Sequence, residues 1–400
     1  MAFDSDTFNF DTPLQMEGTA SVKFDGRRAY FGTEDVIPMW VADMDFAVPP
    51  CVTEALIKRT QHPVYGYTLY PESLYQSVID WFQRRHQWTI EREWIVMAPG
   101  VVPSLHACCL AFAEQNDAVI VQPPVYFPFF SAVTNTQRQL VLNPLQRVNR
   151  RYEINFTQLE EQAKQAKLLM LCTPHNPVGR VWSRAELLGV LRIAQKNNLI
   201  ILSDDIHADL IYPGVKHTML GTFEQEFGDF IRTNLITAIA PSKTFNIPGL
   251  GLSSLIVPNP EHRKALHKVF ELLHVSNNNP FSITAFEAAY RGGDLWLDSL
   301  MRYLENNKNM ARDFFAQHIP HIQQIESEGT YLLWLDCSPM ALTDPQLRDF
   351  FIKQCKVGMN PGIVFGEGGS GFMRMNIGTT KARVKEALVA IQQAVSNDNF

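Results

Sequence analysis

The sequence predicts an α/β protein with a largely parallel main sheet, and two observations lead to this prediction. Short apolar segments typical of buried strands alternate with helix-like segments between about residues 94 and 257. The 400 residues are 46% hydrophobic and 19% charged, which suits a globular chain with one large domain and one smaller domain.

Six apolar runs are the expected strands of the large domain. They are "WIVMAPG", "AVIVQPP", "KLLMLCTPHNP", "LIILSDDIH", "LITAIAPSK" and "GLSSLIVPN". Two helices are expected between them, "PSLHACCLAFAEQ" and "SRAELLGVLRIAQKNN". Pro103 suits a first helical turn, and Ser183 and Glu186 have the spacing of a capping box. Apolar strands that alternate with helices predict a parallel sheet covered on both faces.

The pattern changes from about Thr284 onward. A long helical stretch is followed by the outline of a strand pair in "IQQIESEGTYLLWLDC", a helix near residues 345–354, a Gly-rich segment and a last helix. This order is typical of a smaller α+β domain, which the N-terminal segment is expected to join. We predict a large domain over residues 46–284 and a small domain made of residues 1–45 together with 285–400.

Charge and composition exclude several classes of protein. The formal net charge is -6, whereas a general nucleic-acid binder carries a basic face. The N-terminal "MAFDSDTFNFDTP" lacks the basic region and apolar core of a secretory signal, and no apolar run is long enough to span a membrane. The six cysteines include no C-x-x-C pair and no zinc-like spacing with histidines. We expect a cytoplasmic protein with reduced core thiols and no metal site.

Chemistry is expected just after the strands, because ligands bind beyond the carboxyl ends of parallel strands. The residues at these positions include a lysine, an acid, an amide, an aromatic ring and a glycine turn that opens a helix. They are Gly100, Val101, Val102, Tyr126, Asn176, Asp204, Asp205, Ser242 and Lys243.

Pyridoxal 5′-phosphate would use each of these groups. Its aldehyde condenses with a lysine amine, which explains Lys243 at an apolar strand end. Its ring nitrogen needs an acid such as Asp204, its phosphate suits a helix N-terminus, and its ring stacks on an aromatic side chain. An acid about 3 Å from the ring nitrogen would contribute roughly 5 kcal/mol at an effective dielectric constant near 20. Asp204 also has a plainer interpretation as a turn or N-cap aspartate, which Asp205 fits equally well.

Several motifs together resemble the fold type I aminotransferase superfamily of pyridoxal-phosphate enzymes. They are "CTPHNPVGRVW", "LSDDIHADLIY", "APSKTFNIPGLG" and "FMRMNIGTT". Within it, "VADMDFAVP", "YGYTLYPESL", "DDIHADL", "SKTFNIPG" and "PGIVFGEGGSGFMRMN" resemble the MalY/PatB-type C–S lyases, usually described as cystathionine β-lyases. The resemblance covers nearly the whole chain. It implies a mostly parallel seven-stranded sheet in the large domain, with a smaller α+β domain.

The resemblance also implies roles for individual residues. Lys243 is the Schiff-base lysine and proton shuttle, Asp204 pairs with the ring nitrogen, and Tyr126 stacks on the ring. Asn176 donates to the phenolic oxygen, and Arg374 binds the substrate α-carboxylate as a fork. The remaining expected contacts are Gly100, Val101, Val102 and Ser242 toward the phosphate, the backbone of Val41 and Ala42 toward the substrate, and Tyr67 toward the phosphate of the partner in a homodimer with shared active sites.

Two positions depart from the wider superfamily. His207 stands where many members have a tyrosine, and it either shares the phenolic oxygen or is a satisfied buried histidine. Ala240 stands where many relatives have a serine that binds the phosphate, so Tyr67 and the backbone turn are expected to hold the phosphate instead.

Other candidate residues receive structural interpretations. The "GEGGSG" segment lacks the Lys-Ser/Thr of a phosphate loop and is expected to be a turn that places Arg374. Asp43 and Asp45 are expected in turn and cap roles rather than at a metal. Trp40, Trp81, Trp88 and Trp94 are expected in the core. Tyr65, Phe127 and Phe365 are candidates for a distal pocket that would select the sulfur substituent.

The resemblance favours α,β-elimination of an S-substituted L-cysteine, such as L-cystathionine, to pyruvate, ammonia and a thiol. An aminotransferase that passes the amino group to a 2-oxo acid is the alternative, because both reactions begin with removal of the Cα proton. A non-catalytic ligand sensor is disfavoured by the acidic balance and by the short segment before the fold begins.

Overall fold

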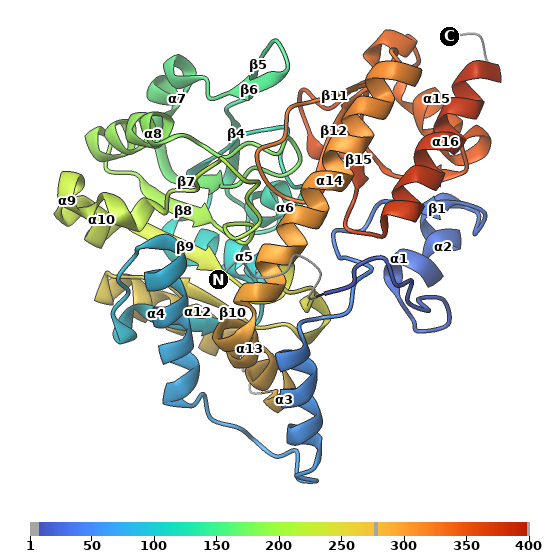
Figure 1. Cartoon of the computed structure of the whole chain (residues 1–400). Coiled ribbons are helices and arrows are strands. Elements are labelled where there is room, and N and C mark those ends of the chain that lie inside the picture. The colour runs from blue at the N-terminus through green and yellow to red at the C-terminus, as the bar shows by residue number, and fades with distance from the viewer. Residues whose placement is uncertain (1–7, 276–278, 398–400) are drawn as a thin grey trace.

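A seven-stranded sheet forms the centre of the molecule (Figure 1). The computed structural model describes residues 8–275 and 279–397. The strand order is β2-β10-β9-β8-β7-β3-β4, and β10 alone runs antiparallel to its neighbours within this sheet. The strands are β2 (Ile95–Ala98), β3 (Ala118–Val121), β4 (Gln139–Leu142), β7 (Ala166–Cys172), β8 (Ile200–Asp204), β9 (Leu235–Ile239) and β10 (Ser253–Ile256).

All six strands predicted from apolar runs are confirmed. The seventh, β4, lies at the edge of the sheet, and its residues are half-buried or exposed rather than fully buried. Its apolar run is only the three half-buried residues Leu140–Leu142, and the sequence analysis did not identify it.

Helices cover both faces of this sheet, as the sequence predicts. Leu168 and Met170 of β7 pack into the cluster that contains α5 (Val101–Phe112) and α12 (Pro260–Leu272). Leu169 and Leu171 pack into the cluster that contains α7 (Phe156–Ala163) and α8 (Arg184–Lys196). The helices of this region are α3 (Pro50–Thr60), α4 (Glu72–His86), α5 (Val101–Phe112), α6 (Pro128–Thr134), α7 (Phe156–Ala163), α8 (Arg184–Lys196), α9 (Glu224–Phe227), α10 (Asp229–Asn234), α11 (Pro241–Thr244), α12 (Pro260–Leu272) and α13 (Pro280–Gly292). The predicted capping box of Ser183 and Glu186 opens α8.

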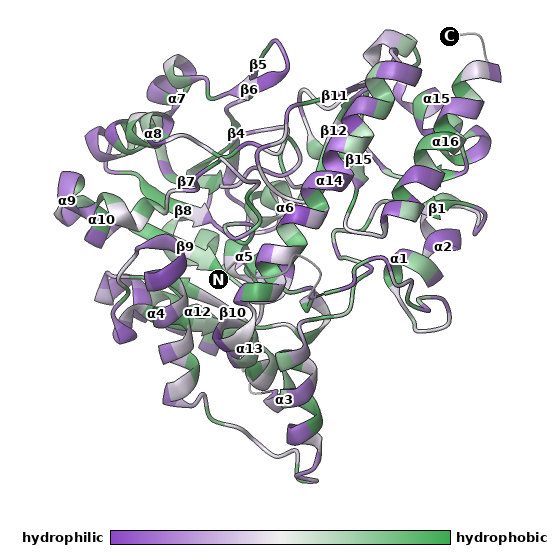
Figure 2. Cartoon of the chain, in the orientation of Figure 1, coloured by the Kyte–Doolittle hydropathy of each residue, from purple (hydrophilic) through white to green (hydrophobic). Residues whose placement is uncertain are grey.

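A second sheet, with the order β11-β12-β15-β14, organises the C-terminal part. Its elements are α14 (Asp294–His318), β11 (Gln323–Gln324), β12 (Leu332–Asp336), α15 (Asp344–Asp349), β13 (Val357–Gly358), β14 (Asn360–Pro361), β15 (Phe372–Asn376) and α16 (Lys381–Asn397). Helix α14 is amphipathic: Leu297, Leu300 and Leu304 are buried at helical spacing, whereas Arg302 and Asn306 are exposed, and the helix carries both hydrophobic and hydrophilic residues (Figure 2).

The N-terminal segment packs against this C-terminal part. It contains α1 (Val22–Asp25), α2 (Arg27–Phe31) and β1 (Ile37–Pro38), and β1 pairs in parallel with β13. Residue 284 lies inside α13, and α13 packs on α3 and α4. The division of the chain into two domains at residues 46 and 284 stays a prediction.

Short elements complete the described chain. They are the hairpin β5 (Gln146–Val148) and β6 (Arg151–Glu153), the 3₁₀ turns η1 (Arg92–Trp94), η2 (Leu220–Phe223), η3 (Pro248–Leu250), η4 (Ser338–Met340) and η6 (Gly362–Phe365), and the π-helical turn η5 (Phe350–Gln354). The helix predicted near residues 345–354 is therefore α15 followed by this π-helical turn.

The core predictions hold. Trp40, Trp81, Trp88 and Trp94 are buried, and all six cysteines are unpaired, five of them buried and Cys51 half-buried. Over residues 8–275 and 279–397, no helix is both long enough and apolar enough to cross a bilayer.

Candidate active site

The residues that follow the strands meet around one cavity of about 220 Å³. The predicted cofactor residues that line it are Gly100, Val101, Val102, Tyr126, Asn176, Asp204, His207, Ser242 and Lys243, together with the predicted substrate residue Ala42. Tyr67 and Arg374 do not line it. The cavity lies at the carboxyl ends of β7, β8 and β9 and at the N-terminus of α5. These residues meet there because the carboxyl ends of parallel strands lie at the same edge of a sheet.

Lys243 reaches the cavity from α11, directly after β9. Its Nζ donates to the carbonyl oxygen of Ala42 at 2.5 Å. Removal from solvent lowers the pKa of Lys243 to about 8, although the charges of Asp43 and Asp204 oppose this shift. An amine in this pKa range accepts and releases a proton near neutral pH more readily than an ordinary lysine does.

Tyr331 shares the acceptor of Lys243, and sequence reasoning missed it. Its hydroxyl donates to the same Ala42 oxygen at 2.9 Å, and its side chain is fully buried. In the sequence, Tyr331 stands just before the apolar run of β12, where an aromatic residue is typical of the hydrophobic core. No local pattern distinguishes it from its neighbours.

Asp204 and Asp205 have different roles, although the sequence leaves them equivalent. Asp205 accepts from His217 Nε2 at 2.8 Å and from the Ser203 hydroxyl, so its carboxylate is engaged in the protein. Asp204 accepts the backbone N–H of Ile206 at 3.2 Å, as the turn interpretation predicts, and it also lines the cavity. Burial raises the pKa of Asp204 to about 7. Such an acid is suited to pairing with a positively charged group in the cavity.

The phosphate end of the predicted site lies at the start of α5. Gly100 precedes the helix, and the first N–H groups of an α-helix have no partner within it. Ser242 and the methyl group of Ala240 also line the cavity. A methyl group donates no hydrogen bond, so Ala240 cannot take the place of the phosphate-binding serine that many relatives have at this position.

Arg374 is a buried cation on β15. Its Nη1 donates to Asn176 Oδ1 at 3.0 Å, and its Nη2 donates to Trp40 O at 3.1 Å and Asn360 Oδ1 at 2.8 Å. Its carbon Cζ lies 4.8 Å from the ring centre of Phe365. Within the described chain, Nε has no hydrogen-bond partner and no carboxylate forms an ion pair with the guanidinium. Burial lowers the pKa of Arg374 to about 10.

A buried cation whose contacts are neutral acceptors is suited to an anionic ligand, because burying an unpaired charge is costly. Arg374 lies one hydrogen bond from the cavity, since Asn176 both accepts from it and lines the cavity. This arrangement places a buried guanidinium without an ion-pair partner in the described chain one hydrogen bond from the cavity that Lys243 and Asp204 line.

His207 is buried at the wall of the cavity, and its Nδ1 has no partner among the described residues. Burial, together with the charges of Lys243 and Arg374, lowers the pKa of His207 to about 3, so the ring is neutral at physiological pH. The unpartnered Nδ1 does not fit a fully satisfied buried histidine, and a contact with a ligand oxygen stays a prediction.

The candidates for the distal pocket do not line this cavity. Tyr65 is exposed and packs against Phe281, Phe127 is half-exposed beside Tyr126, and Phe365 is buried beneath the Arg374 guanidinium. Tyr67 is fully exposed on the segment between α3 and α4.

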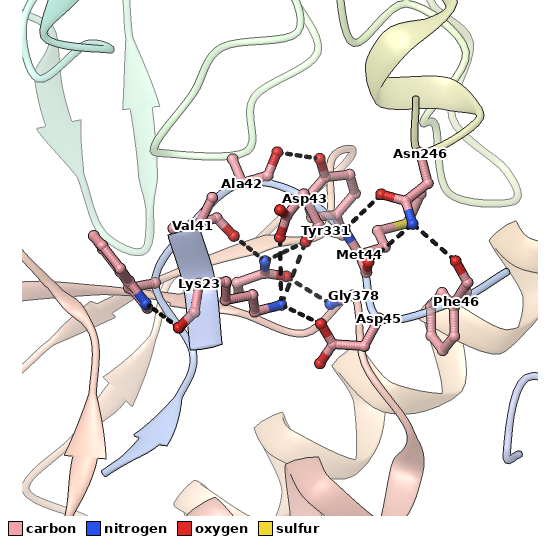
Figure 3. Close-up of polar contacts among 12 residues, drawn as sticks. Lys23, Val41, Ala42, Asp43, Met44, Asp45, Phe46, Asn246, Tyr331 and Gly378 are labelled. Carbon is pink, nitrogen blue, oxygen red and sulfur yellow. Dashed lines mark hydrogen bonds and ion pairs between the residues drawn. The ribbon is translucent and has the colours of Figure 1, made fainter. Parts of the chain in front are cut away.

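The expected turn and cap roles of Asp43 and Asp45 are wrong (Figure 3). Asp45 pairs with the fully buried Lys23 at 2.9 Å, and Asp43 Oδ1 lies 3.8 Å from the same Nζ. Val41 also differs from its prediction: it does not line the cavity, and its carbonyl accepts from Asn376 Nδ2. A buried ion pair therefore lies directly behind the backbone that contacts Lys243.

The predicted turn at residues 366–371 precedes β15 and Arg374. Gly366 has a φ of 87°, and a Cβ there would lie 2.6 Å from the Phe130 ring, so this position requires glycine. The hydroxyl of Ser370 and the N–H of Gly371 donate to Asp344 at 2.8 and 2.9 Å. The turn is held by a carboxylate rather than shaped around a phosphate.

Comparisons with known proteins show the family of this chain. The family model "Aminotransferase class I and II" matches residues 34–391. The chain is 40% identical over 390 residues to cystathionine beta-lyase PatB of Bacillus subtilis, covering 97% of this chain and 100% of that protein. It is 29% identical to protein MalY of Escherichia coli, covering 97% and 99%. The crystal structure of cystalysin from Treponema denticola, which contains pyridoxal 5′-phosphate, superposes with a TM-score of 0.94 at 34% identity, covering 98% of this chain and 99% of that one. The predicted fold type I architecture is confirmed, and the chain belongs to the aminotransferase class I and II family.

Proposed function

We propose that this protein is a pyridoxal-phosphate-dependent C–S lyase that converts S-substituted L-cysteines, such as L-cystathionine, to pyruvate, ammonia and a thiol. One observation carries the proposal: Lys243 and Asp204 face one cavity, and Asn176 connects that cavity to the buried Arg374. The similarity to PatB and cystalysin supports the same reaction class.

The residues around the cavity fit the cofactor. Lys243 would bind its aldehyde carbon, Asp204 its ring nitrogen and the N-terminus of α5 its phosphate, with Ser242 beside the phosphate. Tyr126 would stack on its ring, and the Asn176 side-chain nitrogen would donate to its phenolic oxygen, since Asn176 Oδ1 is already engaged by Arg374. When bound, this cofactor supplies a protonated ring that accepts negative charge from Cα of the amino acid.

The protein's own residues then perform three tasks. Arg374 binds the substrate carboxylate through donors that the protein leaves free, which fixes Cα near Lys243. The neutral amine of Lys243 removes the Cα proton and holds it on Nζ as an ammonium. Asp204, as a carboxylate, keeps a proton on the ring nitrogen. In elimination, the Cβ–S bond breaks and the sulfur leaves with the electron pair.

An aminotransferase is the second candidate, because the matching family model is named for that activity. The same residues serve both reactions up to the loss of the Cα proton. Incubation with L-cystathionine, with no 2-oxo acid added, separates the candidates. Stoichiometric pyruvate, ammonia and thiol are expected. A strict requirement for 2-oxoglutarate would refute the lyase, and full turnover by Lys243→Ala would refute both enzymatic candidates.

We further propose a homodimer with shared active sites in the cytoplasm. Tyr67 is fully exposed beside exposed apolar residues of the same segment, Val64 and Leu69, which suits a surface that a second copy covers. Six unpaired thiols suit a reducing compartment.

A further inference from the structure

The 41–45 segment, which follows β1, contacts the Lys243 amine through Ala42 and a set of three charged side chains: the buried Lys23 and Asp45 and the half-buried Asp43. Asn376 Nδ2 holds this segment through the carbonyls of Val41 and Asp43, and the N–H of Asp45 donates to Gly378 O at 2.8 Å. On the outer side, Lys23 Nζ contacts the side chains of Asp43 and Asp45 and the Asp43 carbonyl (Figure 3). The segment is therefore fixed from several elements at once.

We propose that the 41–45 segment is a proton-holding platform for Lys243: the Ala42 carbonyl fixes the amine, Tyr331 holds that carbonyl, and Asp43 stabilises the ammonium form. The inference rests on the proposed function, because it assigns positioning residues to the proton transfer in which Lys243 takes part. Tyr331 and Asp43 act through Lys243 and Ala42.

The charge balance supports Asp43. Burial raises the pKa of Asp43, and the charges of Lys23 and Lys243 oppose this shift. When Asp43 and Asp45 are both ionised, the single positive charge of Lys23 leaves the set with one negative charge in excess. When the neutral Lys243 amine takes the Cα proton, a C–H bond breaks, an N–H bond forms and the electron pair stays with the substrate. The new ammonium then neutralises the excess charge of the set. Asp43 Oδ1 is buried without a hydrogen-bond partner in the described chain, and its ion pair with Lys23 Nζ is long, at 3.8 Å, so Lys23 neutralises it less closely than it does Asp45, at 2.9 Å.

Tyr331 has a different task. Ala42 is half-buried at the cavity wall, and Lys243 donates to its carbonyl oxygen only while the Lys243 amine is free. The Tyr331 hydroxyl keeps this oxygen satisfied and in place when the amine is engaged elsewhere. The released amine therefore returns to a fixed acceptor rather than to a mobile loop.

The first test measures the Lys243 amine in cofactor-free protein. The rate of its reductive methylation, followed by peptide mass spectrometry against pH, reports the neutral fraction of the amine. The titratable and charged groups around this amine are Asp43, Asp204, Arg374, His207 and Tyr331. Asp43→Asn is expected to lower the midpoint by about one pH unit, because an anion near the ammonium is lost. Asp35→Asn, which removes an exposed carboxylate of the same N-terminal part, is the control and should leave the midpoint unchanged.

The second test uses Tyr331→Phe, which keeps the ring and removes the hydroxyl. We expect kcat for pyruvate formation to fall about fivefold to tenfold with KM within about twofold. Tyr212→Phe is the control, because Tyr212 is equally buried and its hydroxyl has no partner in the described chain.

Equal midpoints for Asp43→Asn and Asp35→Asn would overturn the role of Asp43. Equal kcat values for Tyr331→Phe and Tyr212→Phe would overturn that of Tyr331. A wild-type protein that forms no pyruvate would instead refute the proposed function, and the methylation midpoints would still be measurable.

Discussion

The Arg374 guanidinium and the Asn176 amide are joined by a hydrogen bond of 3.0 Å from Nη1 to Oδ1. Arg374 lies on β15 of the C-terminal sheet, and Asn176 follows β7 of the central sheet. This contact connects the two sheets at the cavity. It also leaves Arg374 with a neutral partner, so the positive charge remains available to an anionic ligand.

Converting this neutral partner to an anion should block the substrate carboxylate. Asn176→Asp would place a carboxylate at hydrogen-bond distance from Arg374, and we expect KM for an S-substituted cysteine to rise on the order of tenfold or more. Asn360→Asp makes the same change at Nη2, 2.8 Å away, but Asn360 does not line the cavity. If both variants raise KM, competition for Arg374 explains the effect. An unchanged KM in Asn360→Asp would show that Asn176 acts through another contact.

The buried Asp204 should make the stability of the cofactor-free protein depend on pH. Its pKa is raised to about 7 by burial, whereas the unfolded value is 3.8, so the fold favours the protonated acid. This contribution is complete below pH 3.8 and is lost as pH rises through 7. Asp204→Asn removes the titration. The unfolding free energy of wild type minus that of Asp204→Asn should therefore fall by on the order of 4 kcal/mol between about pH 4 and pH 8.

Urea unfolding at several pH values measures this difference. Histidines with lowered pKa values, such as His175 and His207, titrate in both proteins and cancel in the comparison. A difference that stays flat over this range would mean that Asp204 is already ionised in the cofactor-free protein. Reconstitution with pyridoxal 5′-phosphate should flatten the curve, because a positive ring nitrogen favours the carboxylate.

Lys23 should be important for stability although it lies outside the cavity. Lys23→Met leaves the Asp45 carboxylate buried without its partner, and we expect a loss of about 3–5 kcal/mol in the free energy of unfolding. Lys23→Met combined with Asp45→Asn should lose less, because the uncompensated charge is removed. The control is Lys356→Met, whose pair with Asp35 is exposed and should contribute less than about 1 kcal/mol. A double variant less stable than Lys23→Met would contradict the charge argument.

The parts of the fold that the sequence predicted are those with local signals. Six strands of the central sheet were predicted from apolar runs. Asn176, Asp204 and Lys243, which lie at or just after the ends of three of these strands, line one cavity. Strand β4 was not predicted, because its apolar run, Leu140–Leu142, is short and only half-buried. The capping box of Ser183 and Glu186 was predictable because both partners lie within one helical turn.

The features that the sequence did not predict depend on contacts between segments that lie far apart in the chain. Tyr331 meets Ala42 across 289 positions, and Asn360 meets Arg374 only because β14 and β15 pair. Lys23 reads as a surface lysine on a short helix, and its burial follows from the packing of the N-terminal segment. No periodicity encodes such pairs, since each partner has an ordinary local context.

Tyr67 allows a direct test of whether two subunits share their active sites. In a dimer with shared sites, the lysine of one subunit works with the tyrosine of the other. Tyr67→Ala and Lys243→Ala should each lose activity alone. Mixing the two variants under conditions that exchange subunits should restore about a quarter of wild-type activity, because about half of the dimers are hybrid and each hybrid has one complete site. Tyr65→Ala mixed with Lys243→Ala is the control, since Tyr65 packs within its own chain against Phe281. Restoration that fails for Tyr67→Ala, in a mixture shown by native mass spectrometry to contain hybrids, would mean that Tyr67 does not complete the site of a partner.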